Sequence, residues 1–192
     1  MEELNPYWLI QAQQGDDYAF AHIVETCQRP VFSLCYRMLG NKEDAEDAAQ
    51  ETFLRAYKSI KKYDKNRSFS TWLLSIAAHY CIDQIRKRRF KVVSIEELPI
   101  PELPDVQPGM DLKISRNEER KKVRELLEHL NPTDRACVVM YYWHDFSYDE
   151  ICQALSLTPS ALKSRLHRAR RAMANIWLEK VPNSLVAERM AP

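Results

Sequence analysis

The chain has 192 residues, of which 28 are basic, 27 are acidic and only three are glycine. The longest apolar run, Ala136–Trp143, is far too short to cross a membrane, and the N-terminus has no signal-peptide pattern, so we expect no membrane insertion. The five cysteines include no C-x-x-C pair and predict reduced thiols in a cytoplasmic protein rather than disulfides or a zinc site.

The first part of the chain predicts helices throughout. Apolar residues recur at helical spacing from Phe20 to Met38, although Pro30 should kink or break this helix. A second helix follows Asn41, which is a good N-cap. Its polar stripe consists of Asp44, Asp47, Gln50 and Glu51. Composition alone favours a solvated face for this stripe over a docking face.

The next segment combines cations with aromatic rings. Lys61, Lys62, Lys65 and Arg67 lie among Tyr63, Phe69 and Trp72, and a helix opened by Ser70 or Thr71 ends in the basic run 86–89. Cations at a helix C-terminus are ordinary dipole partners. Basic residues interleaved with rings also suit single-stranded nucleic acid, because the cations follow phosphates and the rings stack on bases. The alternative is that Phe69, Trp72 or both belong to the core.

An acidic, proline-rich segment divides the chain. Residues 90–112 hold one basic and five acidic residues, and four prolines fall between Leu98 and Asp111. Proline removes a backbone donor and restricts its predecessor, so a long helix cannot form there. The fold class is therefore all-α, with two small helical domains joined by this linker.

The second domain predicts a helix-turn-helix. Asn131 caps one helix, followed by Pro132 and by Asp134 at the capping-box position, and Ser147 with Glu150 caps the next. The helix after Thr158 should bury Leu162, Leu166, Ala169, Met173 and Trp177. Its other face carries Ser160, Lys163, Ser164, His167, Arg168 and Arg171. Such a basic outer face predicts binding in a DNA major groove more than a merely solvated surface.

Three further stretches occur in the order DAEDAAQETF, FSTWL and KSRLHRAR. Together they resemble the extracytoplasmic-function type of bacterial RNA polymerase sigma factor, in its minimal two-domain form. The resemblance covers most of residues 15–178. It implies a first domain over 1–92, a linker over 93–115, a second domain over 116–178 and a short tail over 179–192.

The resemblance also implies roles. The stripe of Asp44, Asp47, Gln50 and Glu51 would dock on the β′ coiled coil of core RNA polymerase. The minus-ten promoter element would be melted and captured by a set of residues on the loop and the helix after it: Tyr63, Lys65, Asn66, Arg67, Phe69, Trp72, His79, Arg86 and Lys87. The minus-thirty-five duplex would contact Ser160, Lys163, Ser164, His167, Arg168 and Arg171. The β flap and an anti-sigma factor are further expected partners.

Two positions depart from the family pattern. His79 stands where the family often has Asn, which bears on minus-ten preference, and Ser156 stands where it often has Gly. If the turn needs positive φ, Ser156 costs on the order of 1 kcal/mol.

We expect no catalytic group, no cofactor and no metal. No Glu has a His three residues later, which argues against a carboxylate-bridged metal protein. An independent helix-turn-helix regulator is the alternative function, and it would need neither the acidic stripe nor the aromatic-basic loop.

Overall fold

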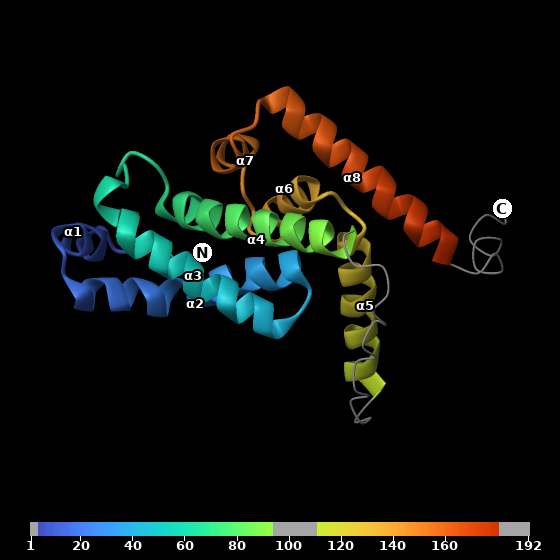
Figure 1. Cartoon of the computed structure of the whole chain (residues 1–192), viewed down its shortest axis with the longest axis horizontal. Helices are drawn as coiled ribbons and strands as arrows, with labels where there is room; N and C mark the ends of the chain where they lie inside the picture. Colours follow the sequence, from blue (N-terminus) through green and yellow to red (C-terminus); the bar gives the residue numbers. More distant parts are fainter. Residues whose placement is uncertain (1–3, 94–110, 181–192) are drawn as a thin grey trace.

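The computed structural model describes residues 4–93 and 111–180, which form two groups of helices (Figure 1). The first group comprises α1 (Pro6–Gln14), α2 (Asp17–Leu39), α3 (Lys42–Ser59), the 3-10 turn η1 (Ile60–Lys62) and α4 (Phe69–Val93). The second comprises α5 (Asp111–Glu128), α6 (Pro132–Trp143), α7 (Tyr148–Leu155) and α8 (Pro159–Lys180). These residues contain no strand, which confirms the all-α prediction.

Side-chain caps fix where most of these helices begin. The Asn41 side chain accepts from the backbone N–H of Asp44 at 2.8 Å, and Asn131 accepts from that of Thr133 at 3.0 Å. Ser147 and Glu150 form a complete capping box at the start of α7. An N-cap of this kind contributes about 1 kcal/mol, so the predicted helix starts follow from local chemistry. Asp134 differs from its predicted capping-box role, because its carboxylate accepts from Arg165 instead.

Several predicted boundaries and burials differ from the structure. α2 is not broken at Pro30, because fully buried residues on both sides, Ile23 and Val31 among them, outweigh the hydrogen bond that proline removes. α4 begins at Phe69, slightly earlier than predicted. Trp177, expected in the core, is 45% exposed near the end of α8, which extends past the second group's other helices (Figure 1).

The helices of the second group do not begin and end at the predicted domain boundaries. α5 starts at Asp111 and therefore takes in the last part of the predicted linker 93–115. α8 ends at Lys180, just beyond the predicted domain end at 178. Residues 94–110 of the predicted linker and residues 181–192 of the predicted tail, 179–192, lie outside the described residues.

The second group packs directly on the first. α6 and α7 contact α4, and α6 also contacts α2. Arg135 is 4% exposed, and its guanidinium donates to the carbonyl of Met38 at 2.5 Å. Burial lowers the pKa of Arg135 to about 10, which leaves it charged at neutral pH. The Thr71 hydroxyl donates to Glu150 at 3.1 Å, so the contact is polar as well as apolar.

None of the described helices combines the length and the apolar character that a membrane span requires.

The turn between α7 and α8 gives a stability prediction. Ser156 has φ 53° and ψ 47°, a left-handed conformation that strains any residue with a Cβ. Ser156→Gly should raise the free energy of unfolding by about 0.5–1 kcal/mol. Gln153→Gly, in the right-handed interior of α7, should lower it by about 1 kcal/mol. Chemical denaturation followed by circular dichroism measures both, and a Ser156→Gly variant no more stable than wild type would contradict the strain.

Candidate functional site

The outer face of α8 gathers all the residues predicted to contact the minus-thirty-five element. Ser160, Lys163, Ser164, His167, Arg168 and Arg171 are all exposed. Leu162, Leu166 and Ala169 lie on the opposite side of the helix and are fully buried. The buried stripe therefore fixes the rotation of α8, and this rotation presents the polar residues together to solvent.

Two other cations of α8 are turned toward their own domain. Arg165 donates to Asp134 of α6 at 2.6 Å, and this carboxylate side chain is only 12% exposed. Arg170 donates through Nε to the Tyr142 hydroxyl at 2.9 Å, and its guanidinium lies over the rings of Tyr141 and Tyr142. The positive charge of α8 is thus divided between holding the helix on α6 and facing outward.

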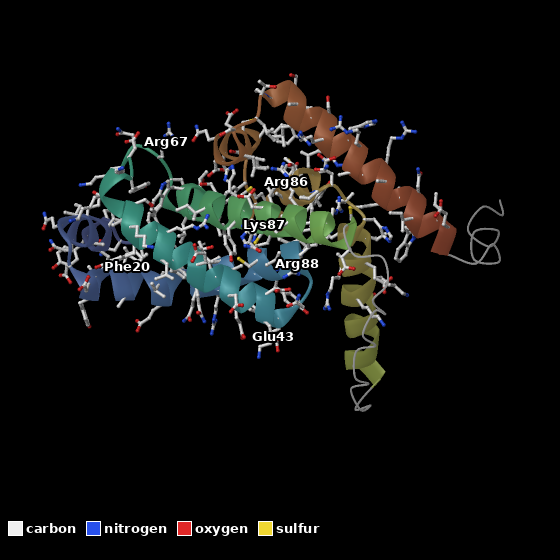
Figure 2. The ribbon with its side chains drawn as sticks, viewed as in Figure 1. Phe20, Glu43, Arg67, Arg86, Lys87 and Arg88 are labelled. Carbon is white, nitrogen blue, oxygen red and sulfur yellow. The ribbon has the colours of Figure 1, made fainter. Side chains whose placement is uncertain are left out.

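The residues predicted to contact the minus-ten element extend along α4 and the loop before it. Lys65, Asn66 and Arg67 are exposed on the loop, and His79, Arg86 and Lys87 are exposed on the helix. Figure 2 shows Arg67 on the loop and Arg86 and Lys87 on the distant half of α4. At about 1.5 Å per residue, Trp72 and Arg86 are roughly 21 Å apart along the helix.

Tyr63 and Phe69 belong to the same predicted set, but both rings are buried, at 6% and 7% exposure. Their ring centroids lie 5.3 Å apart, and each ring also lies next to the half-buried ring of Trp72. The Tyr63 hydroxyl donates to the carbonyl of Arg67. In this arrangement neither Tyr63 nor Phe69 offers a free face for stacking, and the rings instead anchor the loop on α4.

Only part of the acidic stripe on α3 is exposed and outside ion pairs with arginines of this chain. Asp47 and Gln50 are exposed, whereas Glu51 accepts from Arg55 at 2.7 Å and Asp44 pairs with Arg88 of α4. Partial burial opposes ionisation of Asp44. Hydrogen bonds from Arg88 and Asn41 outweigh burial and hold the pKa of Asp44 below its ordinary value. Asp44 therefore ties the start of α3 to the end of α4.

A groove beside this stripe was not apparent from the sequence. It has a volume of about 570 Å³, lies between α2 and α3, and includes Val24, Phe32, Phe53, Glu46 and Gln50 in its lining. Nothing in the sequence pairs Phe53 with Phe32, because the two are brought together by the packing of α2 on α3.

The described residues hold no group of three or more His, Cys, Asp or Glu side chains that could bind a metal ion.

Comparison with known proteins identifies the family. Residues 23–91 match the model for sigma-70 region 2, and residues 120–173 match the model for sigma-70 region 4. The ECF RNA polymerase sigma factor SigW of Bacillus subtilis is 36% identical over 186 residues, which cover 90% of this chain and 96% of SigW. The chain belongs to the ECF family of RNA polymerase sigma factors. It is therefore a transcription initiation factor that directs polymerase to promoters.

Solved structures share the fold of this ECF sigma factor. CnrH in complex with the cytosolic domain of CnrY has 22% identity and a TM-score of 0.67, over 91% of this chain and 97% of CnrH. The sigma factor RpoE in complex with the anti-sigma factor NepR from Bartonella quintana has 18% identity and a TM-score of 0.63, over 84% of this chain and 98% of RpoE. The region 2 match falls on α2–α4, and the region 4 match falls on α5–α8.

The two kinds of cation on α8 should respond differently to mutation. Arg165→Ala should lower the free energy of unfolding by about 1–3 kcal/mol, because Asp134 loses its principal partner inside the domain. Arg171→Ala should change it by less than about 0.5 kcal/mol, because the side chain is exposed. Chemical denaturation of both variants is the measurement. Equal stability of the two would contradict a structural role for Arg165.

Proposed function

We propose that this sigma factor uses three surfaces. The face of α3 binds core RNA polymerase, the loop 63–68 with α4 opens and captures the minus-ten element, and α8 contacts the minus-thirty-five duplex. The observation that carries the proposal is the rotation of α8, which turns six polar or basic residues outward together. The protein supplies no catalytic group and acts in the cytoplasm, where the polymerase performs the chemistry.

On α8 the residue types suggest a division of labour. Ser164 and His167 carry short hydrogen-bonding groups near the start of the helix, which suit base edges in a major groove. Arg168 and Arg171 carry longer cationic side chains, which suit phosphates. Lys163 has the chemistry for either contact. The tie between Arg165 and Asp134 would hold the helix at a fixed angle while these contacts form.

On the first domain, the exposed cations Lys65 and Arg67 precede α4, and His79, Arg86 and Lys87 continue along it. We propose that Lys65, Arg67, Arg86 and Lys87 follow the phosphates of the strand that leaves the duplex, while Asn66 and the exposed part of Trp72 contact its bases. His79 is exposed, and its Nδ1 lies 2.8 Å from the carbonyl of Ser75. It is placed to influence minus-ten preference.

Two grooves suit the polymerase. The groove between α2 and α3 combines the apolar side chains of Phe32 and Phe53 with Glu46. Asp47 is exposed on the adjacent face of α3. We propose that a helix of the β′ coiled coil with apolar and basic side chains binds there. A second groove of about 540 Å³ between α5, α6 and α8 is lined in part by Val123, Val138 and Met173. We assign this apolar groove to the β flap.

Binding of both promoter elements would require the domains to separate. The minus-ten and minus-thirty-five elements lie about 25 base pairs apart, roughly 85 Å of duplex at about 3.4 Å per base pair. In the structure α7 contacts α4 directly. An anti-sigma factor is a further proposed partner, supported by the complex in which the sigma factor RpoE is bound to one.

The docking face gives a first prediction. Asp47→Lys should reduce retention of core RNA polymerase at least about tenfold, because it places a cation where an acidic face meets a basic partner and like charges oppose association. Glu179→Lys makes the same charge change at the far end of α8 and is the matched control. Pull-down with core enzyme measures both. Full retention by a folded Asp47→Lys variant would remove this face from the proposal.

The outer face of α8 gives a second prediction. Ser164→Ala and His167→Ala should relax preference within the minus-thirty-five element, since base contacts discriminate by about 1–3 kcal/mol each. Arg171→Ala should weaken all sequences alike and reduce the slope of log affinity against log salt by about one. Holoenzyme binding to single-base promoter variants at several salt concentrations is the test. The opposite assignment of effects would mean that α8 lies rotated in the groove, and tight specific binding without polymerase would favour an independent regulator.

A further inference from the structure

Helix α1 supports the start of the loop that precedes α4. α1 packs against η1, and Figure 1 shows it beside the end of α3, next to the connection to α4. The side-chain amide of Gln13 donates to the carbonyl of Ile60 at 3.0 Å and to the carbonyl of Tyr63 at 2.9 Å. A primary amide has two N–H donors, so Gln13 directs both of them at this one point of the backbone.

These two carbonyls stand where the loop begins. The Ile60 carbonyl also accepts from the backbone N–H of Tyr63 at 3.0 Å and thereby closes η1. Tyr63 is the first residue after η1, and its carbonyl would otherwise face the loop without a regular helical partner. The contact between Gln13 and Tyr63 spans 50 positions in the sequence, which makes it a tertiary restraint.

The other side of Tyr63 is held by α4. Its ring lies 5.3 Å from Phe69 and 5.1 Å from Trp72, and its hydroxyl donates to the carbonyl of Arg67. The backbone N–H of Arg67 donates to the carbonyl of Asp64 at 3.0 Å. Gln13 fixes the backbone of Tyr63 from α1, while the rings fix its side chain from α4. The loop is therefore ordered before any DNA arrives.

We propose that Gln13 is a positioning residue for promoter opening: through the carbonyls of Ile60 and Tyr63 it holds the loop 63–68 in the conformation that captures the displaced strand. This inference rests on the role proposed above for that loop. A loop that is already ordered loses less conformational entropy when it binds, so more of the interaction energy goes to separating the strands. Gln13 itself need not touch DNA.

The chemistry of Gln13 separates this role from simple packing. Gln13→Met keeps an unbranched side chain of similar length but has no donor. Gln13→Glu keeps the shape and directs carboxylate oxygens at two carbonyls, which repel them. If Gln13 only fills space between α1 and η1, the glutamate variant should perform at least as well as the methionine variant. If its hydrogen bonds matter, the glutamate variant should be the worse of the two.

The experiment uses full-length protein with core RNA polymerase and follows promoter opening by permanganate reactivity of unpaired thymines. Gln13→Met should slow opening by about 2- to 10-fold, the range expected for a net hydrogen bond or two, and Gln13→Glu should slow it further. Core binding and occupancy of minus-thirty-five duplex should not change. Gln14→Met and Gln14→Glu, at the exposed last position of α1, are the matched controls and should open promoters at the wild-type rate.

A double variant, Lys65→Ala with Arg67→Ala, tests the role of the loop separately from the role of Gln13. If it opens promoters normally, the loop has no role in opening and the proposed function of this surface fails. If it is defective while Gln13→Met opens normally, only the role of Gln13 is overturned. Glutamate performing as well as methionine, or loss of core binding in every Gln13 variant, would also overturn the positioning role.

Discussion

The placement of the DNA-facing residues on α4 depends on one constraint, which is that this helix is buried on two sides. The helix packs against α2 and α3 of the first group and against α6 and α7 of the second. Leu73, Leu74, Ala77, Ala78 and Cys81 are all fully buried along it. His79, Arg86 and Lys87 are exposed on the face of α4 opposite these buried residues, whereas the exposed Arg88 pairs with Asp44 of α3. The core thus decides which residues can meet DNA, because burial on two sides leaves α4 no freedom to rotate.

Packing also decides which charged side chains are paired within the protein and which are exposed. A chain with a net charge of +1 obtains local basic surfaces by tying some cations to its own acids and turning others outward. On α8, Arg165 donates to Asp134 and Arg170 donates to Tyr142, both on α6, while Arg171 is exposed. Arg168 is exposed too, but its guanidinium also lies 4.0 Å from the Asp134 carboxylate. Near α3, Arg88 neutralises Asp44 and leaves Asp47 outside that pair. Neighbouring residues of like charge therefore have different roles, set by which partner lies within reach.

Local features of the fold were predictable from the sequence, and most long-range contacts were not. The caps at Asn41, Asn131 and Ser147 and the buried stripe of α8 follow from residue types within one or two helical turns. The left-handed turn at Ser156 was expected through family resemblance, whereas the positive φ of Asp145 was missed. Sequence spacing could not show that Asp134 binds Arg165, that Phe32 lies beside Phe53 in a groove, or that Gln13 reaches Tyr63. Each of these contacts joins separate helices, so it exists only once the helices have packed.

The most direct measurement is transcription in vitro from a library of randomised promoters, using core RNA polymerase and this protein, with sequencing of the transcripts. Two conserved blocks should be enriched at a fixed separation, one near minus ten and one near minus thirty-five, and neither should appear with core enzyme alone. Enrichment of a single block, or transcription that does not depend on promoter sequence, would contradict a division of promoter recognition between α4 and α8.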